Sequence, residues 1–155
     1  MSSETPTEAV LRPAEPEDVP EIVRAYVDAR SAAPMPPPIY PEKDIREWLA
    51  VKVIAPQAGT EVWVAEVDGA VCAFVAFTPT WLEDLFVHPR AQGTGLGTML
   101  LDLVKSLDPD GFGLWVFEMN TPARAFYARH GLREVERTDG SGNQEKTPDV
   151  RMVWP

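Results

Sequence analysis

Three glycines, Gly93, Gly95 and Gly97, lie between an apolar segment that ends at Val87 and an apolar segment that reaches Val104. Such a stretch suits either a tight turn or a phosphate group that lies directly on main-chain N–H groups, because glycine has no Cβ to hinder an approaching oxygen. The first N–H groups of a helix lack partners inside the helix and carry partial positive charge. A pyrophosphate bound there would satisfy them.

Two familiar nucleotide-binding loops do not match this stretch. The Rossmann fingerprint spaces its glycines more widely and lies early in a βαβ unit, whereas the pattern here is G-x-G-x-G after strands of antiparallel type. A P-loop requires Gly-Lys followed by Ser or Thr, which the sequence lacks. Taken alone, the glycines leave open both a turn without a ligand and a phosphate site of another kind.

The hydrophobic pattern predicts the elements that position these glycines. Before them come a short strand at 10–11, a helix to about residue 30, a stiff proline-rich loop at 31–41, a short second helix, and three strand-like runs at 61–67, 70–78 and 81–87. Asp68-Gly69 is a strong hairpin signal between the first two runs. After the glycines we expect a helix to about 107, a strand at 112–119, a short helix at 120–131, and two closing strands at 132–138 and 150–154.

This order predicts an α/β (α+β) fold with a mixed, mostly antiparallel central sheet flanked by helices. A chain of 155 residues suits one domain, which we assign to residues 9–155, after a flexible N-terminus at residues 1–8.

Composition and charge argue against several classes of function. A formal net charge of −10 argues against nucleic-acid binding, which depends on clustered Lys and Arg. No apolar run is long enough to span a membrane, and the polar N-terminus does not resemble a signal peptide. The lone Cys72 suits a buried position, and no His, Cys or Asp cluster has metal-ligand spacing. We therefore expect a cytoplasmic protein with no metal, no nucleic acid and no membrane partner.

Two motifs carry a resemblance to a known family. "LFVHPRAQGTGLGTMLL" resembles the acyl-CoA-binding motif of the GNAT superfamily of N-acetyltransferases, Q/R-x-x-G-x-G/A, which Gln92–Gly97 matches. "NTPARAFYARHGL" resembles a second motif of the family, with Leu132 in place of its final aromatic residue. The motifs have the family's order and spacing, and the resemblance spans residues 10–154. It implies a GNAT-like fold and acetyl-CoA as the co-substrate.

The resemblance also implies how acetyl-CoA is held. Main-chain N–H groups would cradle its pyrophosphate, and they belong to Gln92, Gly93, Thr94, Gly95, Leu96, Gly97 and Thr98. The pantetheine arm would pair like an added strand with the main chain of Leu85, Phe86 and Val87, and the Asn120 side chain would contact it from the other side. Arg90 suits a contact to the nucleotide phosphates, although a surface charge explains it equally well.

Catalytic roles follow from the same resemblance. Tyr127 occupies the position that in many members protonates the departing thiolate, with packing beside Phe126 as its alternative role. An alkyl amine with a pKa near about 10 must lose a proton before it attacks. Glu83 occupies the place where some relatives carry their base, and Asp84 is the second choice. The two should lie on opposite faces of a strand, and a solvated pair is the alternative.

The function predicted from these residues is acetyl transfer from acetyl-CoA to a primary amine, a small cationic molecule, by direct attack. Tyr40, Trp63 and Trp81 are candidates for an aromatic acceptor site. The alternatives are a protein acceptor, at an N-terminus or a lysine, and a non-catalytic acyl-CoA-binding sensor. Relatives are often dimers, so a homodimer also stays open.

Overall fold

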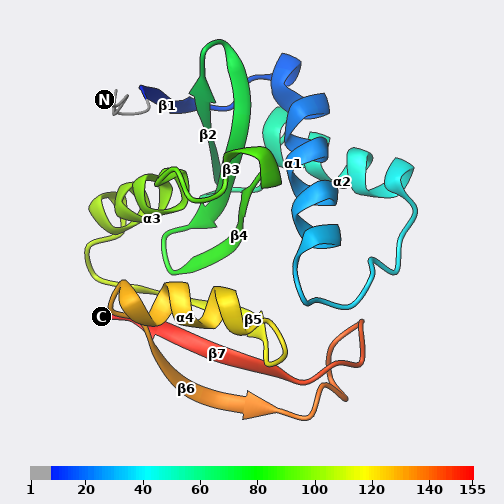
Figure 1. Ribbon diagram of the computed structural model, residues 1–155, viewed down its shortest axis with the longest axis vertical. Helices are drawn as coiled ribbons and strands as arrows, with labels where there is room; N and C mark the ends of the chain where they lie inside the picture. Colours follow the sequence, from blue (N-terminus) through cyan, green and yellow to red (C-terminus); the bar gives the residue numbers. More distant parts are fainter. Residues whose placement is uncertain (1–7) are drawn as a thin grey trace.

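The computed structural model describes residues 8–155, so the predicted flexible N-terminus lies, apart from Glu8, outside the described residues (Figure 1). The four helices are α1 (Val19–Ala32), α2 (Glu42–Ile54), α3 (Leu96–Leu107) and α4 (Thr121–Arg129). The strands are β1 (Ala9–Pro13), β2 (Glu61–Val67), β3 (Ala70–Thr78), β4 (Trp81–Val87), β5 (Phe112–Phe117), β6 (Arg133–Thr138) and β7 (Asp149–Trp154). Two short 3-10 turns, η1 (Pro16–Asp18) and η2 (Pro89–Ala91), precede α1 and the glycine-rich loop.

The strands form one seven-stranded sheet in the order β1-β2-β3-β4-β5-β7-β6. Every neighbouring pair is antiparallel except β4 and β5, which are parallel. This confirms the predicted α/β class with a mixed, mostly antiparallel sheet. The predicted hairpin is also present, since Asp68 and Gly69 both have positive φ, at 52° and 81°, as a two-residue type I′ turn requires.

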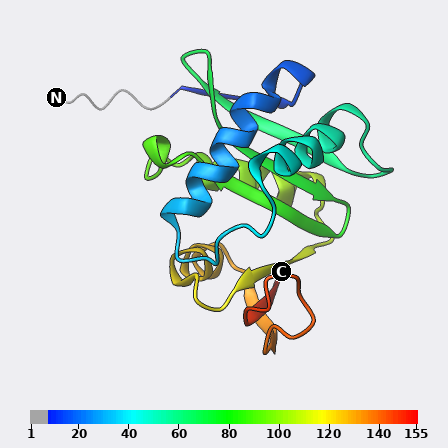
Figure 2. The same cartoon turned by 90° about the vertical axis from the view of Figure 1, so that its right-hand side faces the viewer.

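Helices cover both faces of the sheet, and α1 and α2 lie together across the N-terminal strands (Figures 1 and 2). On the other face, Leu96, Leu100, Leu101 and Val104 recur along one side of α3 and are fully buried. Strand β3 lies between the two layers, so its side chains enter both cores and its sequence is apolar from Ala70 to Phe77.

The parallel strands β4 and β5 separate almost at once. Their ladder contains a single residue pair, Trp81 with Gly113, beside a hydrogen bond from the Gly113 N–H to the Thr80 carbonyl at 3.0 Å. Glycine lets the Trp81 ring pack directly on β5, because a Cβ at residue 113 would lie 2.6 Å from Cζ3 of Trp81 and would force the ring to move. Beyond this point β5, β6, β7 and α4 form a second half of the molecule, visibly set apart from the first in Figure 1.

Within residues 8–155, no helix has the combination of length and apolar character that crossing a bilayer requires.

Candidate active site

The gap between β4 and β5 is a cavity of about 750 Å³, lined by both strands and by residues of α1 and α4. Beyond Trp81, the edge of strand β4 that faces the cavity pairs with no other strand of residues 8–155. The His88 N–H donates to the Cys72 carbonyl at 2.8 Å, and antiparallel alternation then turns the main-chain groups of Leu85 and Val87 away from β3, toward the gap. The Phe86 main chain faces β3 instead, while its side chain lines the cavity. An extended ligand could therefore pair with alternate residues of β4.

A second cavity, of about 610 Å³, adjoins the first and is bordered by the glycine-rich loop. Gly93 and Gly95 have φ of +81° and +89°, and nothing lies within 4 Å of a Cβ placed on either. Gly95 is the N-cap of α3, and no acidic residue occupies the first turn of that helix. The exposed backbone at a helix N-terminus is the arrangement that accepts a phosphate, so the residues fit the pyrophosphate of acetyl-CoA.

The other residues of this loop have internal partners. The Thr94 hydroxyl donates to the Ala91 carbonyl, and the Gln92 side-chain amide donates to the Val87 carbonyl at 3.1 Å. The Thr98 hydroxyl lies 3.0 Å from Nε2 of His130. Leu96 is buried in the core, so it can offer only its main chain to a ligand.

Gly97 has a packing role that the sequence did not reveal. A Cβ at this position would lie 3.3 Å from the ring of Phe126 on α4. The glycine thus allows α3 and α4 to approach closely beside the loop.

Asn120 and Arg90 lie in different surroundings. Asn120 is buried, lines both cavities, and accepts a hydrogen bond from the Ala123 N–H at 3.3 Å as the N-cap of α4. Its side-chain NH₂ group faces no partner among the described residues. Arg90 lies in η2 with Nη2 at 3.9 Å from Sγ of Cys72, and it lines neither cavity.

Tyr127 is buried on α4 and lines both cavities. Its hydroxyl has no hydrogen-bond partner within residues 8–155 and stays accessible. Burial raises the pKa of Tyr127, and the negative charge of Asp84 raises it further. The phenol is therefore protonated at neutral pH and can donate a hydrogen bond.

Glu83 and Asp84 meet at one cation. Nζ of Lys52, on α2, lies 2.8 Å from Oε1 of Glu83 and 2.7 Å from Oδ2 of Asp84. The prediction that these carboxylates lie on opposite faces of a strand is only partly right. Asp84 pairs with Ala76 and Leu82 pairs with Phe77, so Glu83 is the extra residue of a β-bulge, which breaks the alternation.

Both carboxylates line the larger cavity, but Asp84 is the more enclosed, with side-chain exposure of 9% against 32% for Glu83. Burial raises the pKa of Asp84, and the ammonium of Lys52 offsets only part of that increase. Burial in turn lowers the pKa of Lys52, but the two carboxylates outweigh it and the net change is upward. Oδ1 of Asp84 has no partner in the described part of the chain and stays accessible.

The three aromatic candidates for the acceptor site are far from equivalent. Tyr40 lines a third cavity next to the first. Trp63 packs against the core under α3 and Trp81 packs on Gly113, and neither lines any of the three cavities.

Sequence reasoning missed Lys52, Arg30 and Glu145. Arg30 and Glu145 line both the larger cavity and the third one, and Lys52 bridges the two carboxylates. None of them lies in a recognisable motif, so only the tertiary fold identifies them.

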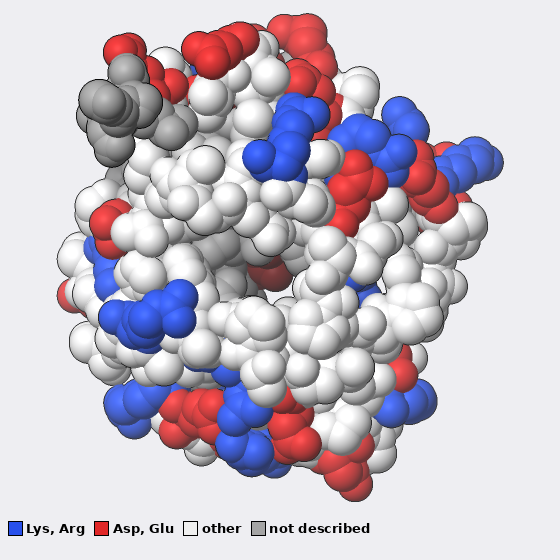
Figure 3. All heavy atoms as spheres, in the orientation of Figure 1, with Lys and Arg blue, Asp and Glu red and all other residues white. Residues whose placement is uncertain are grey.

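In the orientation of Figure 1 the surface is hollowed between the two halves of the molecule, and an acidic side chain is visible at the bottom of the hollow (Figure 3). Within the described residues, no group of three or more His, Cys, Asp or Glu side chains could hold a metal ion. The geometry thus combines an extended main-chain cleft, a glycine-rich loop at a helix N-terminus, a phenol and a carboxylate pair.

Comparison with known proteins agrees with this arrangement. The family model described as "Acetyltransferase (GNAT) domain" matches residues 58–134. An uncharacterized N-acetyltransferase of Archaeoglobus fulgidus is 31% identical over 150 residues, covering 86% of this chain and 99% of that protein. A peptidyl-lysine N-acetyltransferase, YjaB of Salmonella typhimurium, is 30% identical over 61% of this chain and 65% of its own.

Solved structures show the same fold. Apo YjaB from Escherichia coli has a TM-score of 0.76 at 19% identity, covering 95% of this chain and 97% of that one. The PaiA N-acetyltransferase of Thermoplasma acidophilum, in complex with coenzyme A, has a TM-score of 0.70 at 20% identity, covering 94% and 98%. On the family match and the Archaeoglobus relative, this chain belongs to the GNAT family of N-acetyltransferases.

Proposed function

We propose that the protein transfers the acetyl group of acetyl-CoA to a primary amine of a small cationic molecule, by direct attack. The observation that carries this proposal is the position of Tyr127, whose free hydroxyl borders both the cavity beside the glycine-rich loop and the cavity that contains Asp84. A donor arriving from one side and an acceptor arriving from the other would meet at this phenol.

Main-chain groups would hold acetyl-CoA. The N–H groups of residues 92–98 would bind its pyrophosphate, and the outward-facing main chain of Leu85 and Val87 would pair with its pantetheine arm. The Asn120 amide is free to donate to the same arm. Acetyl-CoA supplies the acetyl group as a reactive thioester, and a main-chain N–H near Val87 would donate to the carbonyl oxygen as negative charge develops there.

We assign the base to Asp84 in preference to Glu83. Both line the cavity, but Asp84 is nearly enclosed and its pKa is raised by burial, which brings it closer to that of the ammonium it must deprotonate. Oδ1 is accessible, and it can accept the proton directly or through a water molecule. Tyr127 would then give its proton to the departing thiolate, because it is protonated at neutral pH and borders both reactants.

The cationic character of the acceptor has its own support. Five carboxylates line the larger cavity, and they belong to Glu83, Asp84, Glu136, Glu145 and Asp149. Arg30, which also lines it, together with the ion-paired Lys52 and Arg151, does not balance their charge. Such a site attracts an ammonium ion before the proton is removed. A protein lysine is the second candidate acceptor, because the Salmonella relative is named a peptidyl-lysine N-acetyltransferase.

The test is Tyr127→Phe, assayed by release of free thiol from acetyl-CoA with a panel of amines and lysine peptides. We expect kcat to fall by about 100-fold, with the affinity for CoA and the melting temperature unchanged. An unchanged kcat would refute the assigned acid. CoA binding by the wild type without thiol release for any amine or peptide would instead favour a non-catalytic sensor.

A further inference from the structure

A third cavity, of about 500 Å³, lies beside the proposed acceptor site. Tyr26, Arg30 and Glu145 line both cavities, so the two spaces adjoin through these side chains. The proline-rich loop between α1 and α2 and the loop between β6 and β7 both contribute to its wall, through Tyr40 and Glu145 among others. These loops lie on the same side of the molecule in Figure 1, in cyan and orange. An elongated acceptor could therefore extend from one cavity into the other.

Two carboxylates in this cavity form no ion pair with any described residue. Asp44, on α2, and Glu145 make no ion pair and no side-chain hydrogen bond with any residue from 8 to 155, whereas the neighbouring Glu42 and Glu47 on α2 are both ion-paired. Most acidic side chains near the active site are likewise engaged, by Lys52 or by residues of β6 and β7.

Arg30 is the one Lys or Arg among the described residues that line the cavity, and its guanidinium is turned to other groups. Arg30 is buried, and its guanidinium donates to the Tyr26 hydroxyl at 3.2 Å and to the Pro36 carbonyl at 2.9 Å. Its Nε has no partner in the described chain and is shielded from solvent, so a ligand in the cavity cannot reach it. A ligand therefore meets the free carboxylates of Asp44 and Glu145 and not a free guanidinium edge.

Aromatic rings complete the wall. Tyr40 and Trp48 are 50% and 41% exposed although both are large and apolar. The Trp48 ring already has the ammonium of Lys52 at 4.3 Å from its centroid, so a ligand cation would use the ring of Tyr40 instead. Unpaired carboxylates beside aromatic rings are the surroundings that favour an organic ammonium ion.

We infer that this cavity is a subsite for a second ammonium group of the acceptor, which makes the preferred substrate an aliphatic diamine. The inference rests on the proposed function, since it places the reacting amine at Asp84 and Tyr127. The distal ammonium lies between Asp44, Glu145 and the ring of Tyr40. The occupant we choose is a small molecule, and a lysine peptide is the alternative that the experiment separates from it.

The experiment compares linear monoamines with α,ω-diamines of increasing chain length, by thiol release and by calorimetry in the presence of CoA. We expect diamines to be preferred by at least about 10-fold in kcat/KM, as a charge-assisted contact warrants, with a distinct optimum of chain length. If the overall negative charge of the protein caused the preference, all diamines would be favoured alike, whatever their length. A preference without an optimum of chain length would therefore overturn the subsite.

Substitutions of the two free carboxylates test whether they cause the preference for diamines. Glu145→Gln and Asp44→Asn should each lower the ratio of diamine to monoamine kcat/KM by about 10-fold. The matched control Glu47→Gln, on the same helix but outside the cavity, should keep the wild-type ratio. An equal loss for monoamines and diamines, or a preference for lysine peptides over every diamine, would refute the inference while leaving acetyl transfer intact.

Calorimetry separates the two proposals. Tighter binding of the optimal diamine than of its monoamine counterpart, lost in Glu145→Gln, would support the subsite even if no thiol were released. Equal binding of the two ligands would reject it whatever the turnover.

Discussion

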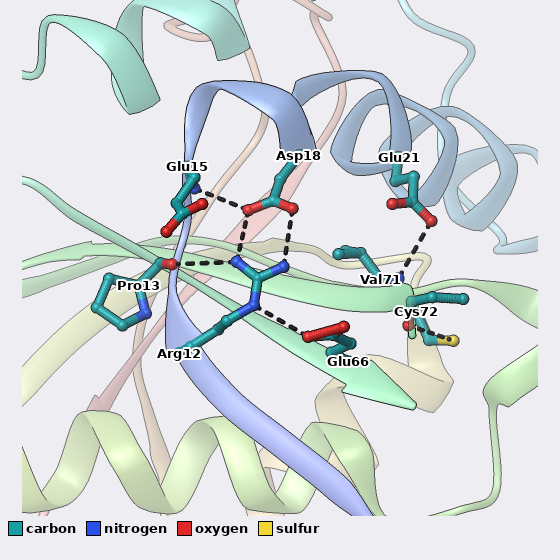
Figure 4. A network of polar contacts seen from close by, with 9 residues as sticks. Arg12, Pro13, Glu15, Asp18, Glu21, Glu66, Val71 and Cys72 are labelled. Atoms are coloured by element: carbon teal, nitrogen blue, oxygen red, sulfur yellow. Dashed lines mark hydrogen bonds and ion pairs between the residues drawn. The ribbon is translucent and has the colours of Figure 1, made fainter. Parts of the chain in front are cut away.

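Arg12 and Lys52 each hold two carboxylates, but the two clusters use their polar groups to different extents. Arg12 donates from Nη1 and Nη2 to both oxygens of Asp18, at 2.7 and 2.9 Å, and from Nε to Glu66 at 3.0 Å (Figure 4). The Glu15 N–H donates to the same carboxylate at 2.7 Å, and the Arg12 guanidinium also reaches the Pro13 carbonyl. This cluster joins β1, β2 and the start of α1, and both oxygens of Asp18 are used.

The Lys52 cluster joins α2 to β4 and leaves acceptors free. Its ammonium contacts one oxygen of Glu83 and one of Asp84, and the remaining oxygen of each has no partner in the described chain. The Tyr127 hydroxyl beside it is also free. A buried carboxylate with both oxygens engaged, as at Asp18, stabilises the fold, whereas free groups in a cavity are available to reactants. The difference in hydrogen bonding thus separates a structural site from a candidate catalytic one.

The sharpest way to break this comparison is to neutralise Asp84. We expect Asp84→Asn to reduce kcat/KM for amines by about 100-fold, because the base is lost. The free energy of unfolding should not fall, since burial opposes ionisation of Asp84 and Lys52 keeps Glu83 as a partner. Steady-state kinetics and urea denaturation at neutral pH measure the two effects.

The control for this variant is Asp102→Asn, an exposed position on α3. Glu83→Gln should cost much less activity than Asp84→Asn. The reverse order would move the base to Glu83, which was the first choice from the sequence.

The equivalent Asp-to-Asn substitution in the Arg12 cluster should reduce stability and not activity. Asp18→Asn should lower the free energy of unfolding by about 2 kcal/mol, because Arg12 loses a bidentate partner and keeps only a single carboxylate contact, to Glu66. Activity should stay near that of the wild type. Glu17→Gln, the exposed neighbour in η1, is the matched control.

This loss should depend on pH. Hydrogen bonds from Arg12 are the main cause that holds the pKa of Asp18 below its ordinary value of 3.8. A depressed carboxyl pKa contributes stability above the unfolded-state value and loses it as pH falls through the folded value. The gap in unfolding free energy between wild type and Asp18→Asn should therefore be full at neutral pH and close in acid. A gap that persists at the lowest pH would assign it to packing instead.

The two clusters also show which features could be predicted from the sequence alone and which could not. The order of elements and the glycine-rich loop were predictable, because helical and strand periods and a motif of adjacent residues are local properties. Lys52 reaches Glu83 across 31 positions of sequence, and only the docking of α2 on the sheet brings them together. The β-bulge at Glu83 breaks the alternation of side chains between the two faces of β4, which the sequence pattern did not reveal.

Aromatic residues in strands show the same limit. Trp63 and Trp81 were candidates for the acceptor site by residue type, but β2 turns Trp63 toward the core under α3 and Trp81 fills the space above Gly113. Which face a strand residue occupies depends on the sheet it joins, so composition could not separate them from Tyr40.

A smaller effect on activity is expected when the positive charge of Lys52 is removed. Lys52→Met keeps the aliphatic stem and removes the charge that lowers the pKa of Asp84. The pKa should rise further, so the acid limb of the kcat/KM profile should move to higher pH, and kcat/KM on that limb should fall by about 10-fold for each pKa unit of the move. Raising the pH should restore most of the activity.

The measurement is the pH profile of kcat/KM, whose acid limb should move to higher pH in Lys52→Met. Lys43→Met, exposed on the same helix, should leave that limb in place. An acid limb that does not move would show that Lys52 only packs against Trp48 and does not tune the base.

The smallest effect concerns the main chain, which the side-chain clusters do not test. Gly95→Ala places a Cβ on a residue with φ of +89°, where an L-residue is strained, so we expect a loss of about 1 kcal/mol in unfolding free energy. No atom lies within 4 Å of that Cβ, so the loss measures backbone strain rather than a clash. If these amides bind the pyrophosphate, CoA affinity measured by calorimetry should fall by more than this strain explains. If stability falls by this amount but the affinity for CoA does not change, the glycines only shape a turn. The proposed pyrophosphate site would then be wrong.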